Sequence, residues 1–593
     1  MLLIEAALVL LSLAVALTYP SLVAGWFESL EKRFAQLARG RVPAFILVGC
    51  LSLGLRAAFL PIEPIPQPVV HDEFGYLLAA DTFAHGRLTN PTHPLWKHFE
   101  SFNIIQRPTY QSYPQPAQGL MLAAGKALAG NPFWGVWFSS GLLCAAICWM
   151  LQAWMPARWA LLGGLIAVLR FGVFGYWANS YWGGALGATG GALVLGALPR
   201  IKRSQRVRDA VVMALGLVLL ANTRPYEGFV FSVPIAIALV AWIFRKRMRA
   251  ENNLALGVAL RRVILPASLV LAIAAVGMGY YFWRVTGSPF RMPYSVERQT
   301  YAIAPYFLWQ PLRPRPVYYN SVVEKMYTGD ESGDEMAGYA FFRSPVGMFA
   351  KLFWSWRFYL GPLLTFPILM LLFTLPYEFS WRDIHPKARF LLLLLSISVV
   401  ALEIECFYAP HYPAPVTCVL FALVLIAMRH LKNWKCWGKP SGLFLTRAIP
   451  VICVVMFVLR ATAGSLHVSL DHYYAPAWYE VGPLDFGRAE IQQKLEQLPG
   501  QHLVIVRYEP THKVFEEWVY NAADIDASKI VWAREMSPAE NETLLRYFHG
   551  RTVWLLKADE TPHRLLPYTI AENPPEQAHL GNAKANNSGA SVK

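Results

Sequence analysis

The feature that most constrains this chain is a recurrence of apolar runs, each long enough to cross a lipid bilayer. A membrane-spanning helix needs roughly 17 to 25 mostly apolar residues, and runs of this kind recur up to about position 465. Charged residues make up only 15% of the chain, against about 25% in an average soluble domain. We therefore predict a polytopic α-helical membrane protein with about twelve transmembrane helices. The predicted spans are residues 3–22, 43–61, 133–153, 159–178, 184–199, 209–223, 228–244, 263–283, 357–377, 389–408, 413–429 and 446–465.

The positions of Lys and Arg indicate the orientation, since cytoplasmic loops carry the positive excess. Five basic loops fall on one side of the predicted topology, so we place them in the cytoplasm of a bacterial inner membrane. The loops 62–132 and 284–350 and everything after residue 466 then lie on the periplasmic side. The net charge of +15 is thus assigned to loops that meet anionic membrane lipids, and no nucleic-acid partner is expected.

The sequence divides into four regions. Residues 1–42 are predicted to form an N-terminal transmembrane anchor and a basic amphipathic segment. A cleaved signal peptide is the alternative for the first apolar run, but the run lacks a positively charged start and an A-x-A-like cleavage site. Residues 43–465 form the transmembrane domain with its two large loops. Residues 466–570 are predicted to form a small soluble α/β domain, with strands at "HLVIVRY", "KIVWA" and "RTVWLLK" and a capping box at residues 537–540. The polar tail 571–593 is expected to be disordered.

The first exported loop opens with an acidic pair in the stretch "VVHDEFGYLLAADTFAHGRLTNP", residues 69–91. Long loops of this kind are usually functional. Asp72 has two interpretations: it caps the helix that follows, or it is a catalytic carboxylate that the helix start orients. Neighbours on a helix point about 100° apart, so one of Asp72 and Glu73 can face a cavity while the other serves the structure. The spacing of acidic and histidine residues is not diagnostic of a metal site, so a divalent cation is left open.

Arginines at the outer ends of the apolar runs are the second feature. Charges inside a membrane are costly and are functional candidates by default, although snorkelling to the interface is the alternative. Arginine binds phosphate through two parallel hydrogen bonds. The candidates for binding a lipid phosphate are Arg170, Arg224 and Arg357.

Short outer turns rich in aromatic and polar residues are the third feature: "YWANSYWGG", "ANTRPYEG" and "FYAPHYPAP". Many of these aromatic residues fit an interfacial belt, but a belt does not require the polar ones. Glycines recur at four-residue spacing through Gly183, Gly187 and Gly191, which predicts a closely packed helix face. Together with the acidic loop, these turns supply the candidates for binding sugar or acceptor. They are His71, Tyr76, Asn179, Tyr181, Trp182, Glu227, His411 and Tyr412.

The chain resembles the GT-C superfamily of glycosyltransferases, in particular the bacterial protein O-mannosyltransferase and aminoarabinose transferase group. The resemblance covers roughly residues 43–430 and is sharpest at His71-Asp72-Glu73 with Tyr76 downstream, just after an early span. It implies that the carboxylate of Asp72, with Glu73 as second candidate, acts on the acceptor.

The expected function is transfer of a sugar from a polyprenyl-phosphate donor to a protein, glycan or lipid acceptor at the periplasmic face. An inverting displacement with a loop carboxylate as general base fits these residues. Two alternatives stay open: a transporter or flippase of lipid-linked sugar, and a non-catalytic envelope assembly protein.

Overall fold

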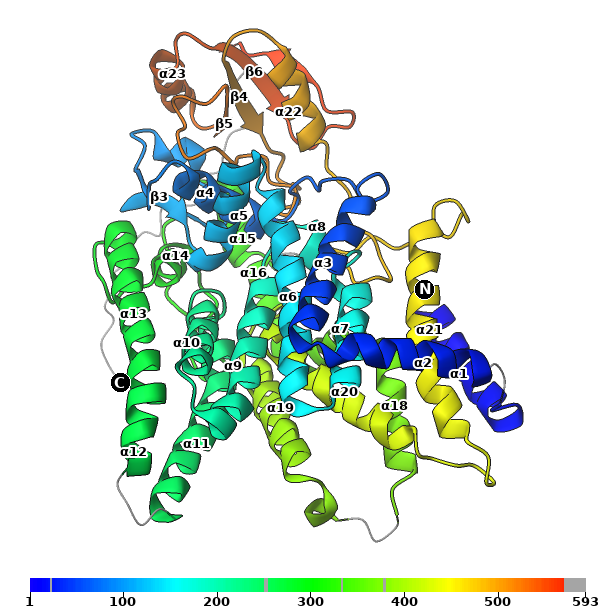
Figure 1. Cartoon of the computed structure of the whole chain (residues 1–593). Helices are drawn as coiled ribbons and strands as arrows, with labels where there is room; N and C mark the ends of the chain where they lie inside the picture. Colours follow the sequence, from blue (N-terminus) through cyan, green and yellow to red (C-terminus); the bar gives the residue numbers. More distant parts are fainter. Residues whose placement is uncertain (22–23, 250–253, 332–333, 377–379, 570–593) are drawn as a thin grey trace, which may run out of the picture.

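The computed structural model describes residues 1–569 apart from 22–23, 250–253, 332–333 and 377–379. Helices dominate it, and a small β-sheet lies at one end of a helical bundle (Figure 1). The tail 571–593, expected to be disordered, lies outside the described residues.

A helix is found at every predicted span. These helices are α1 (Leu2–Thr18), α3 (Arg41–Ala58), α6 (Phe133–Trp154), α7 (Ala157–Phe171), α9 (Ala185–Ser204), α10 (Val207–Ala221), α11 (Pro225–Arg249), α13 (Leu265–Thr286), α18 (Gly361–Phe373), α19 (Pro386–Ile404), α20 (Thr417–Leu431) and α21 (Ser441–Thr462). By length and composition, six helices of the described chain can cross a membrane, or seven if the pair α17 (Pro345–Tyr359) and α18, bent by 99°, forms one span. The chain is a multi-pass membrane protein, and the count of twelve spans stays a prediction.

Shorter elements connect the spans. The segment α2 (Ala24–Arg39) follows α1. Helix α7 ends at Phe171, before the predicted limit at residue 178, and the short helix α8 (Tyr176–Asn179) follows it. Further short elements are α12 (Leu254–Ala259), the π-helical turn η2 (Leu260–Ile264) and the 3₁₀ turns η3 (Trp381–Asp383) and η4 (Ala414–Val416).

The two large loops fold into elements of their own. The first contains α4 (His71–Ala84), β1 (Asn90–Pro91), η1 (Trp96–Phe99), β2 (Ile104–Ile105), β3 (Thr109–Ser112) and α5 (Pro116–Ala129). Its three strands form an antiparallel sheet in the order β1-β3-β2. The second contains α14 (Pro293–Tyr301), α15 (Ser321–Thr328) and α16 (Glu335–Arg343). Both loops lie at the end of the bundle that carries the C-terminal sheet (Figure 1).

The C-terminal elements follow the sequence pattern. They are α22 (Arg488–Gln497), β4 (His502–Arg507), β5 (Ile530–Arg534), α23 (Pro538–Tyr547), β6 (Thr552–Lys557) and β7 (Leu565–Pro567). The sheet order is β5-β4-β6-β7, with β4 parallel to β5 and β6 and with β7 antiparallel. The predicted strands are confirmed, and so is the capping box, in which the Ser537 hydroxyl accepts the Glu540 amide. Strands covered on both faces are expected to be continuously apolar, as "HLVIV" is.

The C-terminal sheet and the first loop share one hydrophobic core. Phe74 and Leu78 of α4 are buried in the same cluster as Leu503 and Ile505 of β4. The Phe74 ring is stacked on Tyr520 at a centroid distance of 4.0 Å. Helix α4 is therefore held in place by its packing against the C-terminal region, which makes it a rigid support for the acidic pair at its start.

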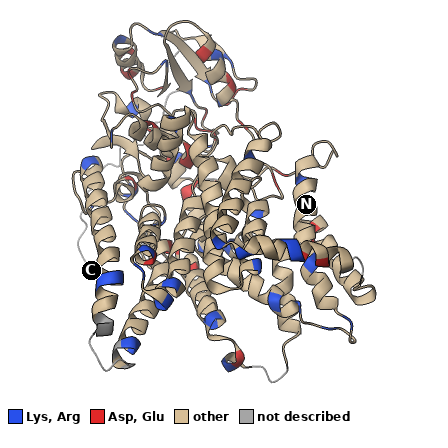
Figure 2. Cartoon of the chain, in the orientation of Figure 1, with Lys and Arg blue, Asp and Glu red and all other residues tan. Residues whose placement is uncertain are grey.

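Charged side chains distinguish the two ends of the bundle. Figure 2 shows Lys and Arg gathered at the helix ends that point away from the C-terminal sheet. This separation agrees with the loop assignment made from charge. The assignment of the sheet end to the periplasm stays a prediction.

Helix α9 makes a close backbone contact with the turn that precedes α20. A Cβ atom at Gly191 would lie 2.2 Å from the carbonyl oxygen of Pro415, whereas one at Gly187 would meet the Ala414 Cβ at an ordinary 3.6 Å. The predicted close-packed glycine face is thus tightest at Gly191. This contact positions the turn that carries His411 and Tyr412.

We expect Gly191→Ala to displace this turn and to destabilise the fold. Overpacking a well-packed interior costs about 1–3 kcal/mol, so thermal unfolding of the purified protein in detergent should shift to lower temperature. Gly187→Ala, one turn away on the same helix, is the matched control and should leave the transition nearly unchanged. Equal shifts for the two variants would contradict the assignment of the contact.

Candidate active site

Glu73, not Asp72, caps helix α4. The helix begins at His71 after the extended residue Val70, so the Glu73 side chain reaches back over the first turn in a capping-box arrangement. Its Oε2 accepts the amides of Val69 and Val70 at 2.9 and 3.0 Å, and its Oε1 accepts the amide of Tyr181 at 3.0 Å. The interpretation of Asp72 as the cap was wrong, and Glu73, the second candidate for the base, has both oxygens engaged in structure.

The neighbouring carboxylate of Asp72 points into a different environment. Its Oδ1 accepts the Asn103 amide at 3.2 Å and lies 3.4 Å from the Tyr113 hydroxyl. Burial raises the pKa of Asp72 to about 6, against the opposing effects of the Arg224 charge and the Tyr113 hydroxyl. A carboxylate with this pKa is ionised at neutral pH and is basic enough to take a proton during a reaction.

A cation lies next to Asp72. Arg224, in the turn between α10 and α11, interacts electrostatically with Asp72 and hydrogen-bonds Tyr76. Its guanidinium lies 4.3 Å from the centroid of the Tyr412 ring and 3.8 Å from Glu227 Oε1. We call these five residues the Asp72–Arg224 cluster: α4, the α10–α11 turn, α11 itself and the loop before α20 each contribute.

Aromatic residues surround the Asp72–Arg224 cluster. Tyr113 packs against Tyr294 at 5.2 Å between ring centroids, and Tyr294 packs against Tyr306 at 5.4 Å. On another side, Trp182 meets His411 at 4.7 Å, and the His411 ring nitrogen lies 3.1 Å from the Tyr176 hydroxyl. Of the predicted sugar-binding residues, Tyr76, Glu227 and Tyr412 belong to the cluster itself. His411 adjoins Tyr412, and Trp182 adjoins His411.

Several residues of the site were missed from the sequence. Asn103 and Tyr113 orient Asp72 directly, and Tyr294 and Tyr306 continue the aromatic wall. Asn103, Tyr113 and Tyr306 lie singly outside helices and strands, and Tyr294 lies on the short helix α14, so no periodic pattern marks them. The proline-rich stretch after Tyr113 was the one available signal.

Arg170 does not lie in this cluster. Its guanidinium donates to the carbonyls of Phe358 and Arg357 and to the Tyr479 hydroxyl, and it lies 4.0 Å from Glu5. Only 2% of the residue is exposed. These contacts join α1, α7 and α17 to the C-terminal segment, so the geometry gives Arg170 a structural role in place of the predicted phosphate contact.

Arg357 belongs to the same structural network. It forms an ion pair with the buried Glu480, and its guanidinium lies 5.5 Å from the centroid of the Tyr473 ring. Since Arg170 and Arg357 are both engaged with protein partners, Arg224 is the one predicted phosphate ligand placed beside Asp72.

The remaining predicted binding residues serve the scaffold. His71 stacks on Phe515 at 4.9 Å, and its Nδ1 lies 3.1 Å from the Tyr520 hydroxyl. Burial lowers the pKa of His71 to about 4, which keeps the ring neutral. Asn179 donates to the carbonyls of Val173 and Gly175, and the Tyr181 amide is bound by Glu73. The side chains of His71 and Asn179 are thus engaged with the protein itself, whereas the Tyr181 contact involves only the backbone amide, so its side chain stays a predicted sugar ligand.

Metal ligation was left open by the sequence. Within the described residues, no group of three or more His, Cys, Asp or Glu side chains is arranged to hold a metal ion. Dependence on a divalent cation stays untested.

No protein-family model matches the chain, and no curated protein matches it. Solved structures match the chain. ArnT from Cupriavidus metallidurans bound to undecaprenyl phosphate is 13% identical, over 87% of this chain and 93% of that chain, with a TM-score of 0.43. The Archaeoglobus fulgidus oligosaccharyltransferase in complex with Zn and sulfate is 12% identical, over 87% of this chain and 67% of that one, with a TM-score of 0.44. The chain is similar to GT-C glycosyltransferases.

The identities and TM-scores are low, so the function proposed for this chain rests on its own side chains.

The two adjacent carboxylates are expected to respond differently to neutralisation. In Glu73→Gln, an NH₂ group replaces one carboxylate oxygen and faces backbone N–H donors with which it cannot form hydrogen bonds. A buried polar group without a hydrogen-bond partner costs about 1–3 kcal/mol. Asp72→Asn keeps the oxygen that accepts from Asn103. The temperature of thermal unfolding should therefore be lower in Glu73→Gln than in the wild type and unchanged in Asp72→Asn. The reverse order would show that Asp72 is the structural residue of the pair.

Proposed function

We propose that this chain is a membrane glycosyltransferase that moves a sugar from a polyprenyl-phosphate donor to an acceptor at the periplasmic face. The observation that carries the proposal is the juxtaposition of Asp72, a carboxylate with a raised pKa, and Arg224, a permanent cation. The first suits removal of a proton from an acceptor, and the second suits a phosphate leaving group.

The placement of the two groups fits a donor with a lipid tail. Arg224 lies directly before Pro225, where the apolar helix α11 begins, so it is at the end of a membrane span. The tail of the donor occupies the bilayer and its phosphate lies at the level of Arg224. Asp72 comes from the exported loop, on the side from which a water-exposed acceptor arrives.

The reaction is a single displacement. The acceptor hydroxyl or amine loses its proton to the Asp72 carboxylate as its oxygen or nitrogen forms a bond to the anomeric carbon. The bond from that carbon to the phosphate oxygen breaks, and its electron pair leaves with the polyprenyl phosphate. Arg224 stabilises the charge that develops on the phosphate. Attack opposite the leaving group inverts the anomeric centre.

Asp72→Asn is expected to lower turnover by about 10²- to 10⁴-fold, the contribution of a general base. The assay measures release of free polyprenyl phosphate from a panel of polyprenyl-phosphate sugars by the purified protein supplied with envelope extract. Since the carboxylate acts as a base only when ionised, kcat/KM of the wild type should fall as the pH drops through about 6 and level off above it.

Glu324→Gln, which alters an exposed carboxylate of the second large loop paired with Arg315, is the control and should retain wild-type turnover. Undiminished turnover of folded Asp72→Asn would contradict the proposal.

Arg224→Lys is expected to lower turnover by about 10- to 10³-fold, because lysine keeps the charge and loses the planar fork that holds a phosphate. Arg357→Lys is the matched control at another outer helix end. Its turnover per folded molecule should stay near that of the wild type, since Arg357 is paired with Glu480. A loss confined to Arg357→Lys would move the phosphate site away from Asp72.

A further inference from the structure

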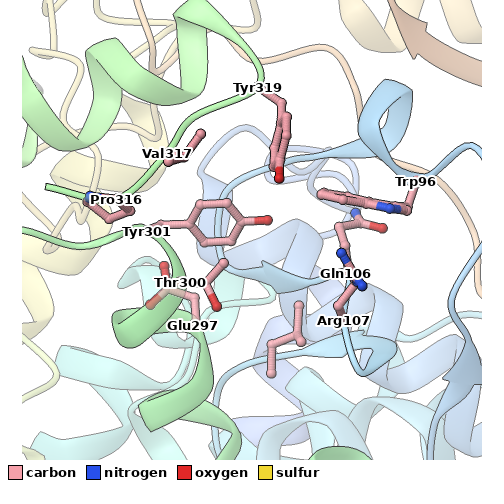
Figure 3. A pocket seen from close by; sticks show the side chains of 10 residues that line it. Trp96, Gln106, Arg107, Glu297, Thr300, Tyr301, Pro316, Val317 and Tyr319 are labelled. Atoms are coloured by element: carbon pink, nitrogen blue, oxygen red, sulfur yellow. The ribbon is translucent and has the colours of Figure 1, made fainter.

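A cavity of about 320 Å³ lies between the two exported loops, apart from the Asp72–Arg224 cluster (Figure 3). The first loop contributes η1 and the residues after β2, and the second contributes α14 and the segment 316–319. None of its lining residues belongs to a span that is long and apolar enough to cross a membrane. Its occupant therefore reaches it from the aqueous side, and the lipid part of a donor does not.

Three aromatic rings face the cavity. Figure 3 shows Trp96, Tyr301 and Tyr319 around the same space. Trp96 and Tyr319 meet nearly edge to face, with centroids 5.3 Å apart and an interplanar angle of 88°. Two surfaces at right angles suit a rigid ring that presents flat C–H faces, as a pyranose does.

Three polar side chains of the cavity offer hydrogen-bond acceptors, and Arg107 adds a donor group, a guanidinium that lies 5.4 Å from the centroid of the Trp96 ring. Gln106 is 2% exposed; its amide donates to the Phe99 carbonyl at 2.6 Å, and its buried Oε1 has no hydrogen-bond partner among the described residues. The Thr300 hydroxyl donates to the Val296 carbonyl at 2.8 Å, which leaves its oxygen free to accept. Glu297 accepts from the Tyr327 hydroxyl at 2.5 Å. An unmet buried acceptor costs about 1–3 kcal/mol, and a ligand with several hydroxyl donors satisfies it.

We propose that this cavity binds a saccharide unit of the acceptor, so that the acceptor is a glycan. Ligand pockets usually measure about 300–1,000 Å³, and this one, at the lower end, has room for about one or two sugar rings. The proposal rests on the proposed function, because it assigns the cavity to the acceptor of that reaction.

The cavity and the general base are built on the same elements. Asn103, which donates to Asp72, directly precedes β2, and the cavity residue Gln106 directly follows it. Tyr294, which packs against Tyr113 beside Asp72, lies one turn before Glu297 on α14. A sugar held in the cavity is therefore fixed relative to Asp72 by two short rigid connections.

The test measures saccharide binding by titration calorimetry on the full-length Asp72→Asn protein in lipid nanodiscs. The probes are methyl glycosides of common hexoses and pentoses and the corresponding disaccharides, together with a serine- and threonine-containing peptide. We expect at least one saccharide to bind, and Trp96→Leu to weaken it by about tenfold or more, as for an aromatic hot spot. Tyr319→Ala, at a residue already 45% exposed, is a second variant that should fold and should also weaken binding.

Trp309→Leu is the control. Trp309 lies in the second large loop, as Tyr319 does, is 66% exposed and does not line the cavity. Its saccharide binding should equal that of the parent. Binding of no saccharide, binding of the peptide alone, or equal affinities in Trp96→Leu and Trp309→Leu would overturn the cavity assignment. The proposed function is tested separately, by loss of polyprenyl-phosphate release in Asp72→Asn, so the two can fail independently.

Discussion

The candidate site depends on one carboxylate whose two oxygens both bind backbone amides. Glu73 accepts three backbone amides, two from the lead-in to α4 and one from Tyr181 in the turn after α8. It therefore links helix α4 to the helical bundle at the residue next to Asp72. Because adjacent residues on a helix diverge by about 100°, fixing Glu73 against the bundle directs Asp72 toward Asn103, Tyr113 and the charge of Arg224.

The C-terminal sheet completes this arrangement from the opposite side. Phe74 follows Glu73 in sequence and stacks on Tyr520, while the Arg488 guanidinium covers its ring at 4.9 Å from the centroid. The start of α4 is thus held between the bundle and the C-terminal region. The four-stranded C-terminal sheet shares a hydrophobic core with the first loop. The C-terminal region therefore supports the site, although it supplies no residue to the Asp72–Arg224 cluster.

Local sequence patterns predicted the elements well and the long-range pairings poorly. Apolar runs and the Ser537 capping box located helices and strands, because these signals act within one element. The acidic pair was recognised, but the capping interpretation was considered for Asp72 and not for Glu73, because the reach of Glu73 back to Val69 and Val70 is visible only in three dimensions. The structural partners of Arg170 and Arg357 were missed for a similar reason. Their partners, among them Glu5, Tyr479 and Glu480, are distant in sequence.

Arg170 and Arg224 differ in how far their guanidinium groups are engaged by the protein. Arg170 donates three hydrogen bonds to protein oxygens and is 2% exposed, so a phosphate would have to displace partners that join four segments of the chain. Arg224 lies 3.8 Å from Glu227, beyond hydrogen-bond length, and 16% of its side chain is exposed. The Arg224 guanidinium contacts the Tyr412 ring, Tyr76 and Glu227. It can therefore rotate to bind an anion without breaking contacts that hold helices together. In the proposed reaction, the charge of Arg224 offsets the electrostatic cost of bringing a phosphate beside Asp72 and Glu227.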